Sequence, residues 1–352
     1  MSSATTYQDR PFGHARAELG EIYPQIVVVD ADLQRATETD LFQQRFPKRY
    51  VDVGIQEANM VGVAAGLALS GKTAFCGTFS SFITQRVCDQ VFVSVAYCRA
   101  NVKLMGVEPG LASGRNGASH QALLDLAIMR AIPGMSVFDP ADAVETRSIL
   151  EYLARTPGPA YMRVPRGKVP VLLDPQTYRF QAGKAAMFHP GSDVTLIACG
   201  ISVAWAIEAA TELEKQGIST RVLNMASIKP LDEEAILKAA SETGCIVTAE
   251  NHSILGGLGG TVAEITARYA PATATYVNTI PGNGSYQVNA QGMGLFTSDI
   301  YSKKATFTYS GSICNGTDNL ESMVGLAEGI GEFDLAKQTG VIEETISVRM
   351  GY

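Results

Sequence analysis

The sequence lacks an excess of positive charge, since 28 lysines and arginines stand against 35 aspartates and glutamates, for a net charge of −7. This balance argues against a nucleic-acid or anionic-membrane partner. The sequence also has no apolar run near the roughly 20 residues of a membrane span. Its N-terminus has no basic-then-apolar signal. We therefore expect a cytoplasmic protein with no membrane and no nucleic acid as partner.

The six cysteines show no Cys-x-x-Cys pair and no histidine-adjacent spacing of a metal site. They lie mostly in apolar stretches, at positions 76, 88, 98, 199, 245 and 314. We interpret them as buried free thiols in a reducing compartment.

Charged residues are scarce, at 18% of 352 residues, against about 25% in an average globular chain. Hydrophobic residues make up 46%. This composition predicts a well-buried protein, and a large subunit interface would account for the small charged surface. The length favours two domains.

Short β-branched runs alternate with helical stretches, which predicts an α/β protein of two domains, each with a mostly parallel sheet flanked by helices. In the first domain, residues 1–164, we expect strands at 25–29, 73–76, 102–106, 136–138 and 160–164, and helices at 12–22, 57–70, 81–97, 121–131 and 141–156. Prolines and glycines mark residues 165–193 as a linker. In the second domain, residues 194–352, we expect strands at 194–198, 220–224 and 245–249, and helices at 203–216, 232–241 and 259–269; from about residue 276 the tail is atypical.

A helix rich in glycine and alanine is expected to begin near Glu57, with a small-residue face suited to close contact with another helix. Glu57 can be interpreted simply as a first-turn glutamate favoured by the helix dipole. It also has apolar neighbours and no basic residue nearby in sequence. Burial would then raise its proton affinity while the helix end lowers it. From this stretch alone both interpretations stay open.

Two aromatic residues, Phe79 and Phe82, are three positions apart. At the start of a helix they would share one face and could form a slot for a flat ring, although ordinary core packing explains the same spacing.

A glycine-rich loop ends at His120, one of only four histidines. A loop histidine is a better functional candidate than a core one, because it is exposed enough to titrate.

Residues 251–260 form another glycine-rich stretch, between an expected strand and an expected helix. Its spacing does not fit a dinucleotide-binding fingerprint, and no acidic partner follows about 20 residues later. We interpret it as a tight strand-to-helix turn.

Together and in this order, these stretches resemble the C-terminal half of a transketolase. The family's Gly-Ile-x-Glu-x-Asn-Met helix matches residues 54–60, its Thr-Phe-x-x-Phe element 78–82, its Asp-Gly-x-Ser/Thr-His-Gln loop 116–121 and its Pro-Ala-Asp-Ala-x-Glu segment 140–145. Residues 30–33, 228–231 and 250–257 also match, so the resemblance covers about residues 10–275.

One family motif is missing. Transketolases hold the diphosphate and its metal through Gly-Asp-Gly and a later asparagine, whereas this sequence contains no Asp-Gly dipeptide. The resemblance therefore implies one subunit of a split transketolase, with no metal ligand of its own. A separate N-terminal diphosphate-binding subunit, in an α2β2 heterotetramer, would supply most ligands of Mg²⁺ or Ca²⁺.

The resemblance also implies roles for individual residues around thiamine diphosphate. Glu57 matches the glutamate that hydrogen-bonds N1′ of the pyrimidine and promotes the tautomer that removes the C2 proton. Phe79 and Phe82 match the lining of the pyrimidine pocket, with Gln85 one turn further on. His120 matches a catalytic histidine that hydrogen-bonds substrate oxygens. Asp32 matches an acidic residue close to the cofactor.

The departures from the family concern the sugar. Asn116 stands where the family carries an aspartate that contacts a donor hydroxyl, and Glu108 stands where a phosphate-contacting histidine is expected. Arg166 still matches the phosphate-binding arginine, and Arg35 could add positive charge. A glutamate facing a phosphate dianion is repulsive. We therefore expect ketol transfer between small sugars of unusual or modified structure.

Two alternatives remain at this point. The β chain of a 2-oxo-acid dehydrogenase shares the glutamate helix and the two-domain plan, but the His-Gln loop and the Ile-Lys-Pro-Leu segment at 228–231 favour a transketolase. A non-enzymatic scaffold is disfavoured because both Glu57 and His120 are present.

Overall fold

The computed structural model describes the backbone of residues 6–243 and 245–269 and, after them, that of separate strands between Thr273 and Met350. Contacts divide the chain into two compact units: Met1–Gly191, Leu196–Asp232 and Val247–Gly260 form the first, and Ser192–Thr195, Glu233–Ile246 and Thr261–Tyr352 the second.

A seven-stranded sheet forms the centre of the first unit, in the order β12-β6-β7-β5-β4-β2-β3. All its neighbouring pairs are parallel except β12 with β6. The strands are β2 (Ile26–Asp30), β3 (Tyr50–Asp52), β4 (Thr73–Phe79), β5 (Val102–Val107), β6 (Ser136–Phe138), β7 (Ala160–Val164) and β12 (Ser227–Lys229). Every residue of β4 is buried, as expected of a strand covered on both faces.

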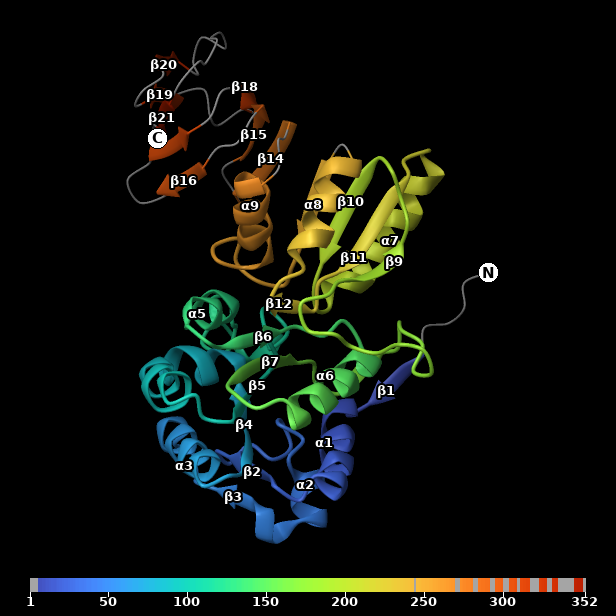
Figure 1. The fold of residues 1–352 in the computed structure, drawn as a ribbon, viewed down its shortest axis with the longest axis vertical. Helices are drawn as coiled ribbons and strands as arrows, with labels where there is room; N and C mark the ends of the chain where they lie inside the picture. The colour runs from blue at the N-terminus through green and yellow to red at the C-terminus, as the bar shows by residue number, and fades with distance from the viewer. Residues whose placement is uncertain are drawn as a thin grey trace. The chain divides into compact units, whose positions relative to one another are not determined.

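Helices cover both faces of this sheet. Figure 1 shows α3 and α5 on one side and α1 and α6 on the other. The helices and helical turns of this part are α1 (Pro11–Ile22), α2 (Asp40–Arg45), η1 (Pro47–Arg49), α3 (Glu57–Leu69), η2 (Phe82–Arg86), α4 (Cys88–Gln90), η3 (Val91–Tyr97), η4 (Gly114–Asn116), α5 (Asp125–Ala131) and α6 (Ala143–Arg155). Local sequence sets their ends: Pro11 opens α1, and Asp142 caps α6 by accepting from the Glu145 N–H at 2.7 Å.

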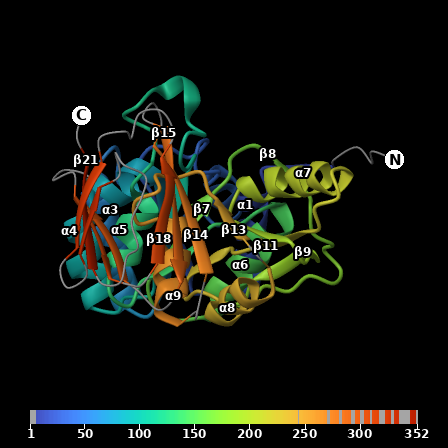
Figure 2. The same ribbon diagram turned by 90° about the horizontal axis from the view of Figure 1, so that it is seen from above.

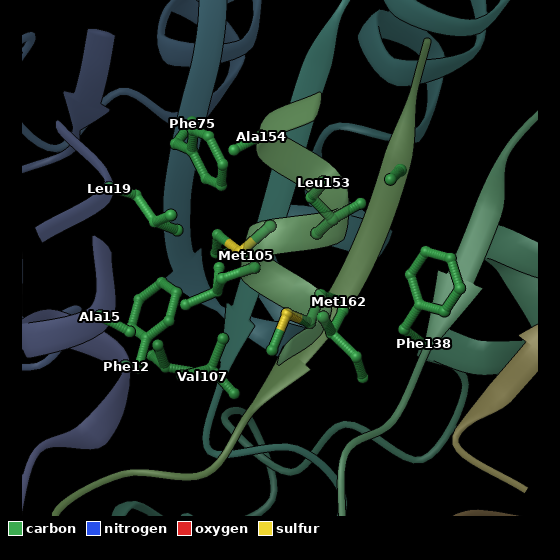
Figure 3. Close-up of a cluster of buried hydrophobic side chains, with 14 of the residues drawn as sticks. Phe12, Ala15, Leu19, Phe75, Met105, Val107, Phe138, Leu153, Ala154 and Met162 are labelled. Carbon is green, nitrogen blue, oxygen red and sulfur yellow. The ribbon is translucent and has the colours of Figure 1, made fainter. Parts of the chain in front are cut away.

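The main core lies between α1, α6 and the sheet. Figure 3 shows side chains from these elements, among them Phe12, Leu19, Phe75, Met105 and Leu153, meeting in one cluster. Each of these five is at most 2% exposed. The core therefore fixes the central strands, and with them the positions of the loops at their ends.

The later part of the chain holds a four-stranded sheet in the order β13-β10-β11-β9, with β9 antiparallel to β11. Helix α7 packs on β11 (Figures 1 and 2). These elements are β9 (Ala186–His189), β10 (Val194–Ala198), α7 (Ser202–Lys215), β11 (Thr220–Asn224), α8 (Glu233–Glu242), β13 (Cys245–Ala249) and α9 (Leu258–Tyr269).

The last strands form two antiparallel sheets, β14-β15-β18 and β16-β17-β21-β19-β20. Their bounds are β14 (Thr273–Ile280), β15 (Gly284–Gln291), β16 (Leu295–Asp299), β17 (Lys304–Thr308), β18 (Gly311–Gly316), β19 (Met323–Ala327), β20 (Gly331–Asp334) and β21 (Thr345–Met350). The side chains of the tail expected to be atypical lie outside the described residues.

Most expected elements are confirmed within two residues at each end, and three expectations need correction. The helix expected at 81–97 is broken into η2, α4 and η3, because both η segments have π-helical geometry and Val87 leaves the helical region between them. The helix expected from residue 121 begins only at Asp125. The stretch expected to be a linker contains β9 and also β8 (Lys168–Pro170), which pairs with β1 (Tyr7–Asp9).

The expectation of buried thiols holds for Cys76 and Cys199 but is wrong for Cys98, which is exposed at the end of η3. Cys88 and Cys245 are half-buried, and the position 314 cysteine lies outside the described side chains. No helix in the described part of the chain is both long and apolar enough to cross a membrane.

Candidate active site

The expected site residues gather at one edge of the seven-stranded sheet, where its parallel strands have their carboxyl ends. Ligands of open α/β sheets bind at this edge. The residues at or just after these strand ends are Asp32 after β2, Glu57 after β3, Phe79 at the end of β4, Glu108 after β5 and Arg166 after β7. The parallel topology thus collects residues that are up to 134 positions apart, from 32 to 166.

Glu57 is the first residue of α3, and its side chain is only 4% exposed. Its Oε1 accepts from Nη1 of Arg86 at 2.9 Å, and the Arg86 side chain is 50% exposed. The burial matches the expectation, but the absence of a basic neighbour holds only along the sequence, because η2 brings Arg86 across from 29 residues away. Arg86 also lies over the Phe82 ring, 4.1 Å from its centroid.

Two phenylalanines and a histidine form a ring cluster, which Arg86 links to the Glu57 carboxylate. The rings of Phe79 and Phe82 stand nearly perpendicular with centroids 5.8 Å apart. The His120 ring lies 4.9 Å from both. Phe79 ends a strand and Phe82 begins η2, so the two rings do not share a helix face as expected, although they remain in contact.

His120 is half-buried, and its Nδ1 lies 3.0 Å from Oγ of Ser119. Gln85, in η2, is exposed to solvent.

Glu108 and Arg166 form an ion pair, with Oε1 and Nη1 2.6 Å apart. The other carboxylate oxygen of Glu108 lies 3.4 Å from Nδ2 of Asn116. Glu108 has a φ of 51°, a left-handed conformation that is uncommon for a residue with a β-carbon. The structure thus brings together the three residues expected at the sugar: Glu108 and Asn116, which depart from the family pattern, and Arg166, which matches it. The positive charge of Arg166 is already balanced by Glu108 of the same chain.

The loop after β2 carries Asp32 and Arg35, and both are exposed. Asp52 fixes the start of this loop, because its carboxylate accepts from the Asp32 N–H at 3.1 Å and from Nε2 of Gln34 at 2.5 Å. Asp30, the last residue of β2, accepts from the Leu33 N–H at 2.6 Å. Burial raises the pKa of Asp30, and its hydrogen bonds oppose this effect.

A fully buried charge cluster links β7 to α5 and to the residue that follows β6. Arg163 donates from Nε and Nη2 to the two oxygens of Asp125, at 2.8 and 2.7 Å, and from Nη1 to Asp139 at 3.1 Å. The Tyr161 hydroxyl donates to Asp125 at 2.6 Å. Burial would raise the pKa of Asp125, but Arg163 more than offsets this and lowers it. The same pairing holds the pKa of Arg163 well above its usual value, so this cluster remains charged.

Family models match both halves of the chain: the pyrimidine-binding domain of transketolase over residues 10–171 and the C-terminal domain of transketolase over residues 183–294. A 6-deoxy-6-sulfo-D-fructose transketolase subunit from Clostridium sp. (strain MSTE9) is 47% identical over 70% of this chain and 76% of its own length. The chain belongs to the transketolase family.

Two further transketolases are similar. An apulose-4-phosphate transketolase subunit from Phocaeicola vulgatus is 43% identical over 72% of this chain and 82% of its own length. A solved split gene transketolase, an inactive β4 tetramer, is 44% identical with a TM-score of 0.70, over 77% of this chain and 89% of its own. These relatives favour the transketolase interpretation over the 2-oxo-acid dehydrogenase alternative.

The cofactor of the transketolase family is thiamine diphosphate, and the residues present fit its aminopyrimidine. A buried carboxylate, Glu57, can share a proton with a ring nitrogen, and the phenyl rings of Phe79 and Phe82 can pack against a flat heterocycle. The donor set therefore agrees with the cofactor that the family uses.

Sequence reasoning missed two residues of this site. Arg86 pairs with Glu57, and Asp52 holds the Asp32 loop. No local sequence pattern marks either residue, because each contacts a residue that is 20 or more positions away in the chain.

Proposed function

We propose that this chain is the pyrimidine-binding subunit of a split transketolase, which moves a two-carbon ketol unit from a ketose donor to an aldose acceptor. The observation that carries the proposal is the buried Glu57 carboxylate, linked through Arg86 to the ring cluster of Phe79, Phe82 and His120, at the carboxyl edge of a parallel sheet. Thiamine diphosphate, when bound, supplies the electron sink for breaking and forming carbon–carbon bonds.

In this proposal, each of the site residues has its own role. Glu57 holds and returns a proton at the pyrimidine, and its burial keeps water from competing for that proton. Phe79 and Phe82 orient the ring. His120 hydrogen-bonds substrate oxygens, while Asp32 and Gln85 border the cofactor.

A partner subunit would supply the diphosphate-binding residues and most metal ligands, in an α2β2 assembly. Two of the relatives support this, because one is named a subunit and another a split gene product, and this chain covers most of the length of each. An exposed face of α3 also favours assembly: among the residues that the structure describes, no atom lies within 4 Å of a β-carbon placed on Gly62 or Gly66. Leu69 is exposed on the same helix, and Tyr97 at the end of η3, which packs against α3. Such apolar surface is typical of a subunit interface.

We propose that the sugar carries less negative charge than a phosphate dianion at the position facing Glu108. Without Glu108, the Arg166 guanidinium would be free to bind an anionic group. Glu108 already occupies one edge of this guanidinium and offsets its positive charge. Asn116 can both donate and accept, so it suits a hydroxyl pattern that an aspartate would not. The exposed Arg35 could add a weak positive field. Relatives named for a sulfonated and a phosphorylated sugar suggest modified substrates of this general class.

The function is tested by mixing this chain with its diphosphate-binding partner, thiamine diphosphate and Mg²⁺, and measuring ketol transfer. Glu57→Gln should abolish turnover and slow proton exchange at C2 of the cofactor by orders of magnitude, because an amide cannot accept and return the proton. NMR measures this exchange in the assembled complex.

Glu21→Gln is the matched control, since Glu21 also pairs with an arginine, Arg45, at 2.9 Å but on the outer surface. It should leave exchange and turnover unchanged. An unchanged exchange rate in Glu57→Gln would reduce Glu57 to a helix-terminus residue and overturn the proposal.

A further inference from the structure

The glycine-rich stretch after β13 contacts the segment that carries the proposed sugar-binding residues, and both belong to the first compact unit. Oδ1 of Asn251 accepts from the Leu111 N–H at 3.0 Å. Nδ2 of the same side chain donates to the Pro109 carbonyl oxygen at 3.1 Å. One side-chain amide thus satisfies a backbone donor and a backbone acceptor that are 140 and 142 positions away along the chain.

These two contacts lie at the base of the segment between Glu108 and His120. Gly110 exchanges two backbone hydrogen bonds with Ala122, at 3.1 and 2.9 Å, and this bridge closes the segment. Gly110 has a φ of 62°, and a β-carbon there would overlap Asn251. The close approach of the amide therefore requires a glycine at this position.

Asn251 is itself fixed from behind. Its carbonyl oxygen accepts from Nη1 of Arg163 at 3.2 Å, and Arg163 is held by the buried Asp125. The Ser253 N–H donates to the Leu123 carbonyl at 3.3 Å, on the other stem of the segment. The amide is thus supported by a rigid, fully buried cluster rather than by solvent-exposed groups.

We infer that Asn251 is a positioning residue for the sugar-binding segment, setting where Glu108, Asn116 and His120 stand without touching the substrate. This inference rests on the proposed function for its catalytic consequence, but its structural part does not. Only an amide fits the role: aspartate would lose the donor and place a charge against the Pro109 carbonyl, and alanine would lose both contacts.

The structural part is tested by hydrogen–deuterium exchange of the full chain. In Asn251→Ala the peptide spanning residues 108–122 should exchange about tenfold faster, because its base loses two hydrogen bonds. Asn101→Ala is the matched control: Asn101 also donates from Nδ2, to Oγ1 of Thr73 at 3.0 Å, but at the opposite end of the sheet. It should leave this peptide unchanged.

Asn251→Asp keeps the size and the acceptor, so it serves if the alanine variant does not fold, and it should also speed exchange of the peptide. Unchanged exchange in a folded Asn251 variant would overturn the inference. This result does not depend on turnover, so it is distinguishable from a failure of the proposed function, in which the complex would transfer no ketol unit at all.

The catalytic part is tested in the assembled complex. Asn251→Ala should raise KM for the ketose donor about tenfold while C2 proton exchange, which depends on Glu57, stays at the wild-type rate. A parallel loss of C2 exchange would mean a general structural role and would overturn the assignment as a positioning residue for the sugar.

Discussion

The ion pair between Glu108 and Arg166 gives a prediction about substrate charge. Replacing Glu108 with glutamine removes one negative charge and keeps the length of the side chain. Because Glu108 Oε1 lies 2.6 Å from Arg166 Nη1, the change leaves the arginine positive and available to an anionic sugar. We expect the variant to use phosphorylated ketoses better and unphosphorylated ones about as well as before.

The size of the effect follows from this geometry. An anion on the opposite edge of the guanidinium would lie roughly 5–6 Å from the Glu108 carboxylate, a repulsion of about 3 kcal/mol per unit charge at an effective dielectric of ~20. The Arg166 side chain is one-third exposed, so solvent screens the pair. We therefore take about half of this repulsion, about 1.5 kcal/mol, which corresponds to a roughly tenfold change in kcat/KM for an anionic sugar.

The assay is the ratio of kcat/KM for phosphorylated and unphosphorylated ketoses in the assembled complex. Glu108→Gln should raise this ratio about tenfold. Glu151→Gln controls for a general charge effect, because Glu151 pairs with Arg147 at 3.2 Å on the exposed surface of α6. A wild type that already prefers the phosphorylated sugar strongly, or a ratio that does not move in Glu108→Gln, would refute the reasoning.

Two predictions concern stability. Burial raises the pKa of Glu145 to about 7 from 4.5, so its contribution to stability is full below pH 4.5 and is lost as the pH rises through 7. Glu145→Gln should remove this loss, on the order of 3–4 kcal/mol, and urea unfolding at pH 4.5 and 7.5 checks it; an unchanged pH dependence contradicts it. Asp125→Asn should lower the unfolding free energy by about 3–5 kcal/mol, because it leaves the buried Arg163 without its main partner. A urea midpoint close to wild type would contradict that.

The secondary structure could largely be predicted from local sequence, because each strand of the central sheet is a short apolar run. The strands Ser136–Phe138 and Ala160–Val164 have the bounds expected of them. The expectation of one helix at 81–97 fails because the apolar pattern does not distinguish short π-helical segments from a continuous α-helix. Strand β9 was missed because it lies among the prolines and glycines that suggested a linker, and only its pairing with β11 makes it a strand.

The site could be predicted only as far as its motifs reach. Glu57, Phe79 and His120 each stand in a local pattern, and the family resemblance orders them. The residues that hold the site in place have no such local pattern. Arg86 is 29 residues from Glu57, and Asn251 is 140 residues from Leu111. Such pairs depend on the sheet order and on the turns between strands, which no window of sequence contains.

Three carboxylates near the site each pair with an arginine, and the exposure of the arginine distinguishes their roles. Arg163 is 1% exposed, so moving it away from Asp125 would leave a buried charge unpaired, and that pair can only support the fold. Arg86 and Arg166 are 50% and 33% exposed, so either guanidinium can turn into solvent at little cost to itself, but the buried Glu57 carboxylate then needs a new hydrogen-bond partner. In the proposed function, a pyrimidine nitrogen would be that partner for Glu57, and Glu108 would adjust to the charge of the sugar. The pairs that border the sheet edge are therefore the replaceable ones, and the pair beneath them is permanent.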